Sequence, residues 1–399
     1  MKYIVILGDG MPDYPLEELG GKTPLQYART PYMDKLAKQG EMGMVKTVPQ
    51  GMPAGSDVAN LSVMGYDPAR YYTGRSPIEA VAMGVKLAEE DMAFRCNLVT
   101  LSGEGPYKKR RMLDYSSDEI STPEAREIIE EVAARLGNET FNFYTGISYR
   151  HLMVWRGGPD GFDLTPPHDI TGKEIAAYLP EGENGPVLLR FMEESCSFLP
   201  EHTVNRERQS RGLRPANSIW LWGQGRRPRL DSFKEKYGVE GAVISAVDLI
   251  KGLGILAGLE VVNVPGATGN ISTNFRGKAL KAVEALKEGR DFVFIHIEAP
   301  DEAGHRGELE IKIRAIEEID EKVVGEVLRG LEEFPEYRLM VLSDHPTPLT
   351  LRTHTAEPVP FCIYNKGDAV KNPQGEFSES FAAGGVFFPE GYRLMDHFL

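Results

Sequence analysis

The sequence is poor in cysteine, with only three in 399 residues, Cys96, Cys196 and Cys362. Their spacing matches no metal-binding motif, so neither a cysteine-ligated metal site nor a disulfide framework is expected. Because Cys96 and Cys362 lie inside apolar runs, we predict buried free thiols. Free thiols suit a reducing compartment, so we expect a cytoplasmic protein.

The chain also lacks a surplus of positive charge and a long apolar run. Its formal net charge is −14 at pH 7, which argues against binding nucleic acid or a membrane surface through phosphate contacts. A membrane span needs about 20 consecutive apolar residues, and no stretch approaches that length. We therefore expect an enzyme with a small-molecule substrate and no nucleic-acid or membrane partner; the sequence leaves its oligomeric state open.

Alternating strand and helix patterns dominate the rest of the sequence. Thr30 and Pro31 begin an expected helix that Gly40 ends, directly after an N-terminal strand. The alternation breaks after about residue 112 and returns near residue 216. We therefore predict a discontinuous α/β domain over residues 1–112 and 216–399, interrupted by an inserted domain over residues 113–215.

Asp and His residues follow several of the expected strands. In open α/β sheets ligands bind at the carboxyl ends of the strands, and these residues share that edge. Carboxylate and imidazole groups together suit Mn²⁺, Zn²⁺, Co²⁺ or Mg²⁺. The candidate ligands are Asp9, Asp301, His305, Asp344, His345 and His354.

Each residue alone has a simpler interpretation. An Asp at a strand end is often a turn former, and a lone His is usually in the core or on the surface. The coincidence of two Asp/His pairs with Asp9 and His354 on one edge favours a metal site. The other histidines lack this context, and we interpret His296, inside its strand, as structural.

Ser56 follows Gly55 at the expected start of a helix. The simplest interpretation is a helix N-cap. Beside a pair of divalent cations, however, a serine hydroxyl can attack phosphorus, and the helix N-terminus favours an anion.

Six segments carry a resemblance to a known family: residues 8–11 (GDGM), 55–62 (GSDVANLS), 65–77 (GYDPARYYTGRSP), 214–223 (RPANSIWLWG), 299–305 (APDEAGH) and 343–348 (SDHPTP). Together they resemble cofactor-independent phosphoglycerate mutases of archaeal type, in the alkaline phosphatase superfamily. The resemblance implies an alkaline-phosphatase-like three-layer α/β sandwich with an inserted smaller α+β domain. It also implies interconversion of 3-phosphoglycerate and 2-phosphoglycerate.

The same resemblance assigns roles to the candidate residues. Ser56 becomes a nucleophile that forms phosphoserine. Two divalent ions, with Mn²⁺ first among them, are then held by two sets of residues: Asp9, Ser56, Asp344 and His345 in one, and Asp301, His305 and His354 in the other.

The family also needs cations that face the substrate phosphate and carboxylate. We take Arg150, Arg214 and Lys251 as candidates, although most of the 45 Lys and Arg residues are expected to be solvated. Arg214 and Lys251 lie in recognisable motifs at an element boundary, and arginine offers bidentate phosphate geometry.

Residues 165–173 (TPPHDITGK), together with residues 343–348 (SDHPTP), resemble a branch of the same family proposed to act as homoserine kinases. That branch suggests a phosphotransferase for a small amino alcohol as an alternative function. A metal-dependent phosphatase is a third hypothesis, and a metal-binding scaffold without activity is a fourth. Against the kinase, residues 16–23 lack the first glycine of a Walker-type ATP loop.

Overall fold

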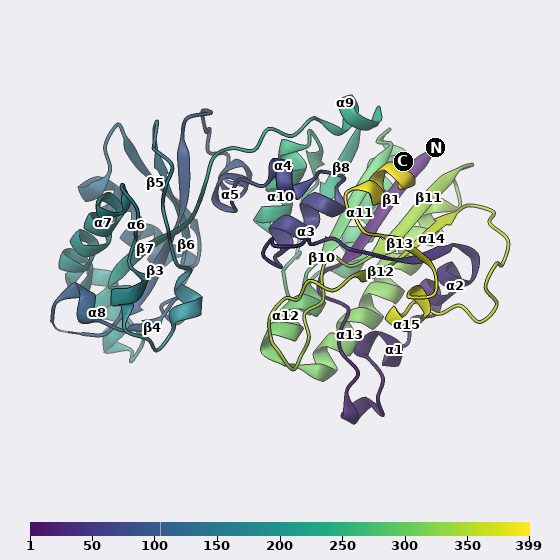
Figure 1. Cartoon of the computed structure of the whole chain (residues 1–399), viewed down its shortest axis with the longest axis horizontal. Helices are drawn as coiled ribbons and strands as arrows, with labels where there is room; N and C mark the ends of the chain where they lie inside the picture. Colours follow the sequence, from purple (N-terminus) through teal and green to yellow (C-terminus); the bar gives the residue numbers. More distant parts are fainter. Residues whose placement is uncertain (104) are drawn as a thin grey trace. The chain divides into compact units, whose positions relative to one another are not determined.

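The computed structural model describes residues 1–103 and 105–399. The described chain forms two compact units: unit 1, Met1–Tyr72 and Arg229–Leu399, and unit 2, Thr73–Pro228 (Figure 1). Each described unit has its own apolar core. Among these residues no helix combines the length and apolar character that a bilayer crossing requires.

Unit 1 is built on a mixed sheet with the strand order β13-β2-β12-β11-β1-β10-β8-β9. Its centre, β11-β1-β10-β8, is parallel, while β12 is antiparallel to both of its neighbours. The strands are β1 (Lys2–Gly8), β2 (Glu41–Val45), β8 (Gly241–Ile244), β9 (Glu260–Val261), β10 (Phe292–Ile297), β11 (Tyr337–Leu342), β12 (Val359–Asn365) and β13 (Val386–Phe388).

Helices cover both faces of this sheet. Ile4 and Ile6 of β1 belong to a core formed with α2, α11 and α13, whereas Gly254 of α10 lies against Val243 on the other face, where α10 and α16 also contact α3. Unit 1 contains α1 (Pro24–Tyr27), α2 (Pro31–Gln39), α3 (Ser56–Val63), α4 (Pro68–Tyr71), α9 (Phe233–Tyr237), α10 (Asp248–Leu256), α11 (Phe275–Lys287), α12 (Ala299–Arg306), α13 (Leu309–Ile319), α14 (Gly325–Leu331), α15 (Glu379–Ala382) and α16 (Arg393–Phe398). This is the three-layer α/β sandwich that the family resemblance implied.

Helix α2 begins at Pro31 and ends before Gly40, as predicted. Its cap differs from the expectation, because the Thr30 side chain accepts no hydrogen bond from the first turn. The carboxylate of Asp320 accepts them instead, from the backbone N–H groups of Tyr32 and Met33 at 3.2 and 2.7 Å.

Unit 2 is an antiparallel sheet with helices. The strand order is β4-β3-β6-β5, and β7 also pairs with β3. The strands are β3 (Met92–Leu101), β4 (Met112–Asp114), β5 (Phe141–Ile147), β6 (Arg150–Trp155) and β7 (Ser218–Gly225), and the helices are α5 (Ser76–Ala82), α6 (Thr122–Leu136), α7 (Gly185–Phe198) and α8 (Thr203–Ser210).

The boundaries between the units differ from those predicted. Residues 73–112 and 216–228 were expected in the larger domain, yet both segments lie in unit 2. The physical reason is strand pairing: β3 pairs with β6, β4 and β7, so β3 is a central strand of the sheet of unit 2 and β7 lies beside it.

All three cysteines are buried free thiols, as predicted for Cys96 and Cys362. Burial raises the pKa of each thiol above its ordinary value, which keeps these groups protonated and unreactive.

Candidate active site

Three parallel strands deliver the carboxylates to one edge of the sheet. Strands β11, β1 and β10 are neighbours. Asp9 follows β1 directly, Asp344 follows β11 after one residue, and Asp301 lies in the first turn of α12, the helix after β10. Gly10 lets the segment after β1 pack closely against Asp301 and Thr347. Its φ is +64°, and a Cβ there would meet the Cα of Asp301 and the Oγ1 of Thr347. Only glycine combines that conformation with so close an approach.

Asp9, Ser56, Asp344 and His345 form a first group, and His345 lies at its centre. Its Nε2 is 3.1 Å from Ser56 Oγ, 3.4 Å from Asp344 Oδ2 and 3.6 Å from Asp9 Oδ1. Its Nδ1 is 3.3 Å from Thr347 Oγ1, whose own proton goes to a carboxylate. The Nδ1–H of His345 therefore donates to Thr347, which leaves the Nε2 lone pair directed at the carboxylates and Ser56.

Asp301, His305 and His354 form the second group. The Nδ1 atoms of the two histidines lie 3.0 and 3.1 Å from backbone carbonyls, those of Arg352 and Ala54, so the Nε2 atoms carry the lone pairs. These Nε2 atoms are only 2.8 Å apart, and each is within 3.4 Å of a carboxylate oxygen of Asp301. Burial opposes protonation of His305, but the Asp301 carboxylate raises the pKa of His305 to about 9. The second group therefore favours a positive charge beside Asp301.

The first group also calls for a cation. Asp9 and Asp344 are 2% and 0% exposed, and among the described residues Asp9 Oδ1 has no hydrogen-bond partner. Burial, followed by the charges of Asp344 and Asp301, raises the pKa of Asp9 well above its ordinary value. Buried carboxylates that converge without a counter-charge are costly unless they are paired or bind metal. Both groups therefore fit divalent cations.

Neighbouring side chains hold these loops in place. Lys312 of α13 is fully buried, and its Nζ donates to Asp13 Oδ2 at 2.7 Å and to the carbonyl of Thr347 at 2.8 Å, which ties the loop after β1 to the loop after β11. Asn60 of α3 donates to Asp344 Oδ2 and to the carbonyl of Ser56, both at 2.9 Å. This places the N-terminus of α3 beside the first group.

The structure thus brings together the seven residues that the sequence singled out: Asp9, Ser56, Asp301, His305, Asp344, His345 and His354. Their individual roles remain predictions. It also adds His296, whose Nε2 is 3.0 Å from Asp9 Oδ2. Sequence reasoning set this residue aside because it lies inside a strand.

Unit 2 carries a group of arginines that includes Arg150. Glu79 of α5 pairs with Arg75 at 2.8 Å and with Arg95 at 3.3 Å, and Arg150 interacts electrostatically with all three. Burial above all, with the charges of Arg75 and Arg150, lowers the pKa of Arg95 to about 10 despite Glu79. Three guanidinium groups around one carboxylate leave an excess of positive charge suited to an anion.

The other two predicted cations have different surroundings. Arg214 is half exposed and pairs with Asp114 at 3.1 Å and Asp118 at 3.5 Å, so acidic neighbours offset its charge. Lys251 of α10 lies in unit 1, where its Nζ is 3.6 Å from Asp248.

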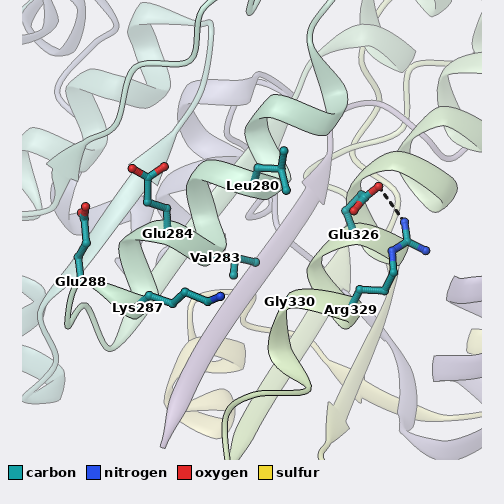
Figure 2. A pocket seen from close by; sticks show the side chains of 8 residues that line it. All are labelled: Leu280, Val283, Glu284, Lys287, Glu288, Glu326, Arg329 and Gly330. Carbon is teal, nitrogen blue, oxygen red and sulfur yellow. Dashed lines mark ion pairs between the residues drawn. The ribbon is translucent and has the colours of Figure 1, made fainter.

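A surface hollow between α11 and α14 is not a comparable site (Figure 2). Its apolar lining includes Leu280 and Val283, and its charged residues include Glu326 and Arg329, which pair with each other at 2.9 Å. It shares no residue with the Asp/His groups. The edge of the sheet is therefore the candidate active site.

The fold and the site together define an α/β protein with Asp/His groups suited to divalent metal. A sequence profile of the 2,3-bisphosphoglycerate-independent phosphoglycerate mutases matches residues 37–205. A mutase with this name from Methanothrix thermoacetophila is 52% identical over 99% of this chain and 98% of its own length. One from Methanosarcina barkeri is 50% identical over 96% of both. The chain belongs to the family of 2,3-bisphosphoglycerate-independent phosphoglycerate mutases and is an isomerase.

Solved structures agree with this assignment. A Pyrococcus horikoshii protein is similar with a TM-score of 0.82 and 30% identity over 100% of this chain and 96% of that one. The cofactor-independent phosphoglycerate mutase from Thermoplasma acidophilum has a TM-score of 0.65 and 28% identity, over 100% and 98%. The resemblance found in the sequence is confirmed.

Proposed function

We propose that the protein interconverts 3-phosphoglycerate and 2-phosphoglycerate through a phosphoserine at Ser56. In the first step a bond forms between Ser56 Oγ and phosphorus, and the bond from phosphorus to the glycerate oxygen breaks. In the second step the other glycerate hydroxyl attacks phosphorus and Ser56 is restored. One glycerate oxygen gains a proton and the other loses one, so the protons balance over the two steps. No water or nucleotide is consumed.

The observation that carries this proposal is the position of Ser56. Its hydroxyl is the first side chain of α3 and lies 3.1 Å from His345 Nε2. A hydroxyl there has the N-terminus of a helix behind it, which favours the anionic oxygens of a phosphoryl group. A serine that served only as a cap would not need converging carboxylates and imidazoles beside it.

The two residue sets would each hold one divalent ion, and we propose Mn²⁺ in both. Asp9, Ser56, Asp344 and His345 form one set, and Asp301, His305 and His354 the other. When bound, such ions stabilise negative charge on phosphoryl oxygens and make a neighbouring hydroxyl more acidic.

We further propose that the arginines of unit 2 bind the charged groups of the substrate. Arg150 is exposed and its guanidinium lies over the ring of Tyr149 at 4.8 Å, which restricts the side chain. With Arg75 and Arg95 it offers donors to a carboxylate or phosphate.

Arg150→Ala is therefore expected to raise the KM for 3-phosphoglycerate about ten- to a hundredfold, the effect of losing one charged hydrogen bond. Steady-state kinetics of purified protein measures it. Arg190→Ala is the matched control, because Arg190 is an exposed arginine of the same unit whose partners are Glu194 at the surface and the ring of Phe191. Arg214→Ala tests the remaining candidate of that unit. An unchanged KM in Arg150→Ala would remove this residue from the binding site.

A nucleotide requirement separates the mutase from the kinase-like alternative. With 3-phosphoglycerate and Mn²⁺, we expect full turnover without ATP and without bisphosphoglycerate, and no phosphorylation of homoserine when ATP is supplied. A coupled assay with each mixture measures both. Product that forms only with ATP and an amino alcohol would favour the kinase-like branch suggested by residues 165–173. In that segment the ring of His168 lies 5.3 Å from the ring of Trp222.

We place the protein in the cytoplasm, the reducing compartment that suits three buried thiols. A small phosphorylated molecule is the partner that we propose.

A further inference from the structure

His296 of β10 lies between Asp9 and Ser245, and it is fully buried. Its Nε2 is 3.0 Å from Asp9 Oδ2, and its Nδ1 is 3.2 Å from Ser245 Oγ. Three adjacent parallel strands create this row: β1 is followed by Asp9, β10 contains His296, and β8 is followed by Ser245. The backbone is fixed as well, because the buried Nζ of Lys278 donates to the carbonyl of His296 at 3.0 Å.

The hydrogen bonds determine where the imidazole proton lies. Ser245 Oγ accepts the backbone N–H of Val247 at 2.9 Å, and its own hydroxyl proton is free to go to His296 Nδ1. The proton of the ring is then on Nε2 and is donated to Asp9 Oδ2, since an ionised carboxylate only accepts. The result is a directed chain from Val247 through Ser245 and His296 to Asp9.

This series of hydrogen bonds occupies one carboxylate oxygen of Asp9 and leaves the other without a partner in the described structure. Oδ2 accepts from His296, whereas Oδ1 is buried with no hydrogen-bond partner among the described residues and lies 3.6 Å from His345 Nε2. We propose that His296 is a positioning residue, which holds Asp9 so that only Oδ1 faces the divalent ion of the first set. The inference rests on the proposed function in that it takes this set to hold a metal.

The competing role for His296 is that of a direct ligand, because its ring nitrogen, Asp9 and Asp344 lie close enough together to share one ion. In the arrangement above neither nitrogen has a free lone pair: one carries the proton for Asp9 and the other accepts from Ser245. Partners that orient a ligand in this way commonly change metal affinity about 10- to 100-fold when they are removed.

The test is a titration of metal-free protein with Mn²⁺ in the absence of substrate. Electron paramagnetic resonance measures the free Mn²⁺ at each step, and calorimetry measures the heat of binding. We expect wild type to bind two ions. His296→Ala should bind one of them about 10- to 100-fold more weakly and the other unchanged. His296→Gln, whose amide N–H can replace the Nε2–H donor, should recover most of the lost affinity. Near-ultraviolet circular dichroism establishes that each variant is folded.

Ser245→Ala provides a second, milder variant, since it removes only the outer hydrogen bond. It should weaken the same ion by a few-fold. Wild-type affinity in folded His296→Ala would overturn the inference, and so would a Gln variant as weak as Ala. Loss of one nitrogen ligand in the Mn²⁺ spectrum of His296→Ala would show direct ligation instead. A wild type that binds two ions but does not isomerise phosphoglycerate would refute the proposed function and leave this inference intact.

Discussion

Replacing Ser56 with alanine is expected to lower mutase activity by several orders of magnitude while the protein stays folded. Without the hydroxyl no covalent intermediate forms, and a water molecule in its place cannot return the phosphoryl group to the same glycerate. The side chain is partly exposed, so its loss leaves no large cavity in the core. The measurement is turnover of 3-phosphoglycerate at saturating substrate and Mn²⁺.

Ser62→Ala is the matched control for this experiment. Ser62 lies on the same helix, α3, and its buried hydroxyl has no hydrogen-bond partner in the described part of the chain. Removing an unsatisfied hydroxyl costs little, so this variant should keep its activity. Mass spectrometry of wild type quenched during turnover should find phosphate on Ser56. Substantial mutase activity in Ser56→Ala would mean that the hydroxyl is not the nucleophile.

Removal of metal is expected to abolish activity, and Mn²⁺ should restore it more effectively than other divalent ions. The physical reason is the charge of the site: three carboxylates, those of Asp9, Asp301 and Asp344, are at most 6% exposed, and they converge on imidazole lone pairs. Dialysis against a chelator, followed by assays with single added ions, measures the effect.

The same preparations should differ in thermal stability. An ion that binds only the folded state stabilises it by about 2.7 kcal/mol at a hundredfold excess over Kd, so Mn²⁺ should raise the Tm of the metal-free protein. Sodium chloride at equal ionic strength is the control for simple screening. Full activity in a preparation shown to be metal-free would contradict the assignment of both residue sets.

The clustered Asp and His residues were accessible from sequence because they lie in segments that follow expected strands, and Ser56 was accessible because it stands at an expected helix start within a family motif. Asp9, Asp301 and Asp344 each come shortly after an apolar run, and the carboxyl ends of neighbouring parallel strands meet at one edge. The α/β class follows from the alternation of strand and helix patterns, whereas the three-layer arrangement came from the family resemblance.

The domain boundaries were not accessible in the same way. Strand β3, Met92–Leu101, is buried along its whole length, and such a run is typical of the central strands of a parallel sheet. Its antiparallel partners β6 and β7 begin about fifty and more than a hundred residues later, and periodicity carries no information about pairing at that distance.

His296, Arg75 and Arg95 were missed for a related reason. The importance of His296 depends on the register that pairs it with Leu7, two residues before Asp9. Arg75 and Arg95 meet only through Glu79, and among 45 basic residues neither is distinctive without that contact. Pairing register and tertiary contacts, rather than local pattern, determine these parts of the site.

The strand order of unit 1 also has a consequence for how the chain is made. Strand β1 lies between β10 and β11, whose residues, 292–297 and 337–342, leave the ribosome long after it. At 5 to 20 residues per second the delay is roughly fifteen seconds to a minute. Unit 2 pairs its strands entirely within residues 92–225, so we expect it to fold first, while the apolar N-terminal strand remains unpaired and depends on chaperones.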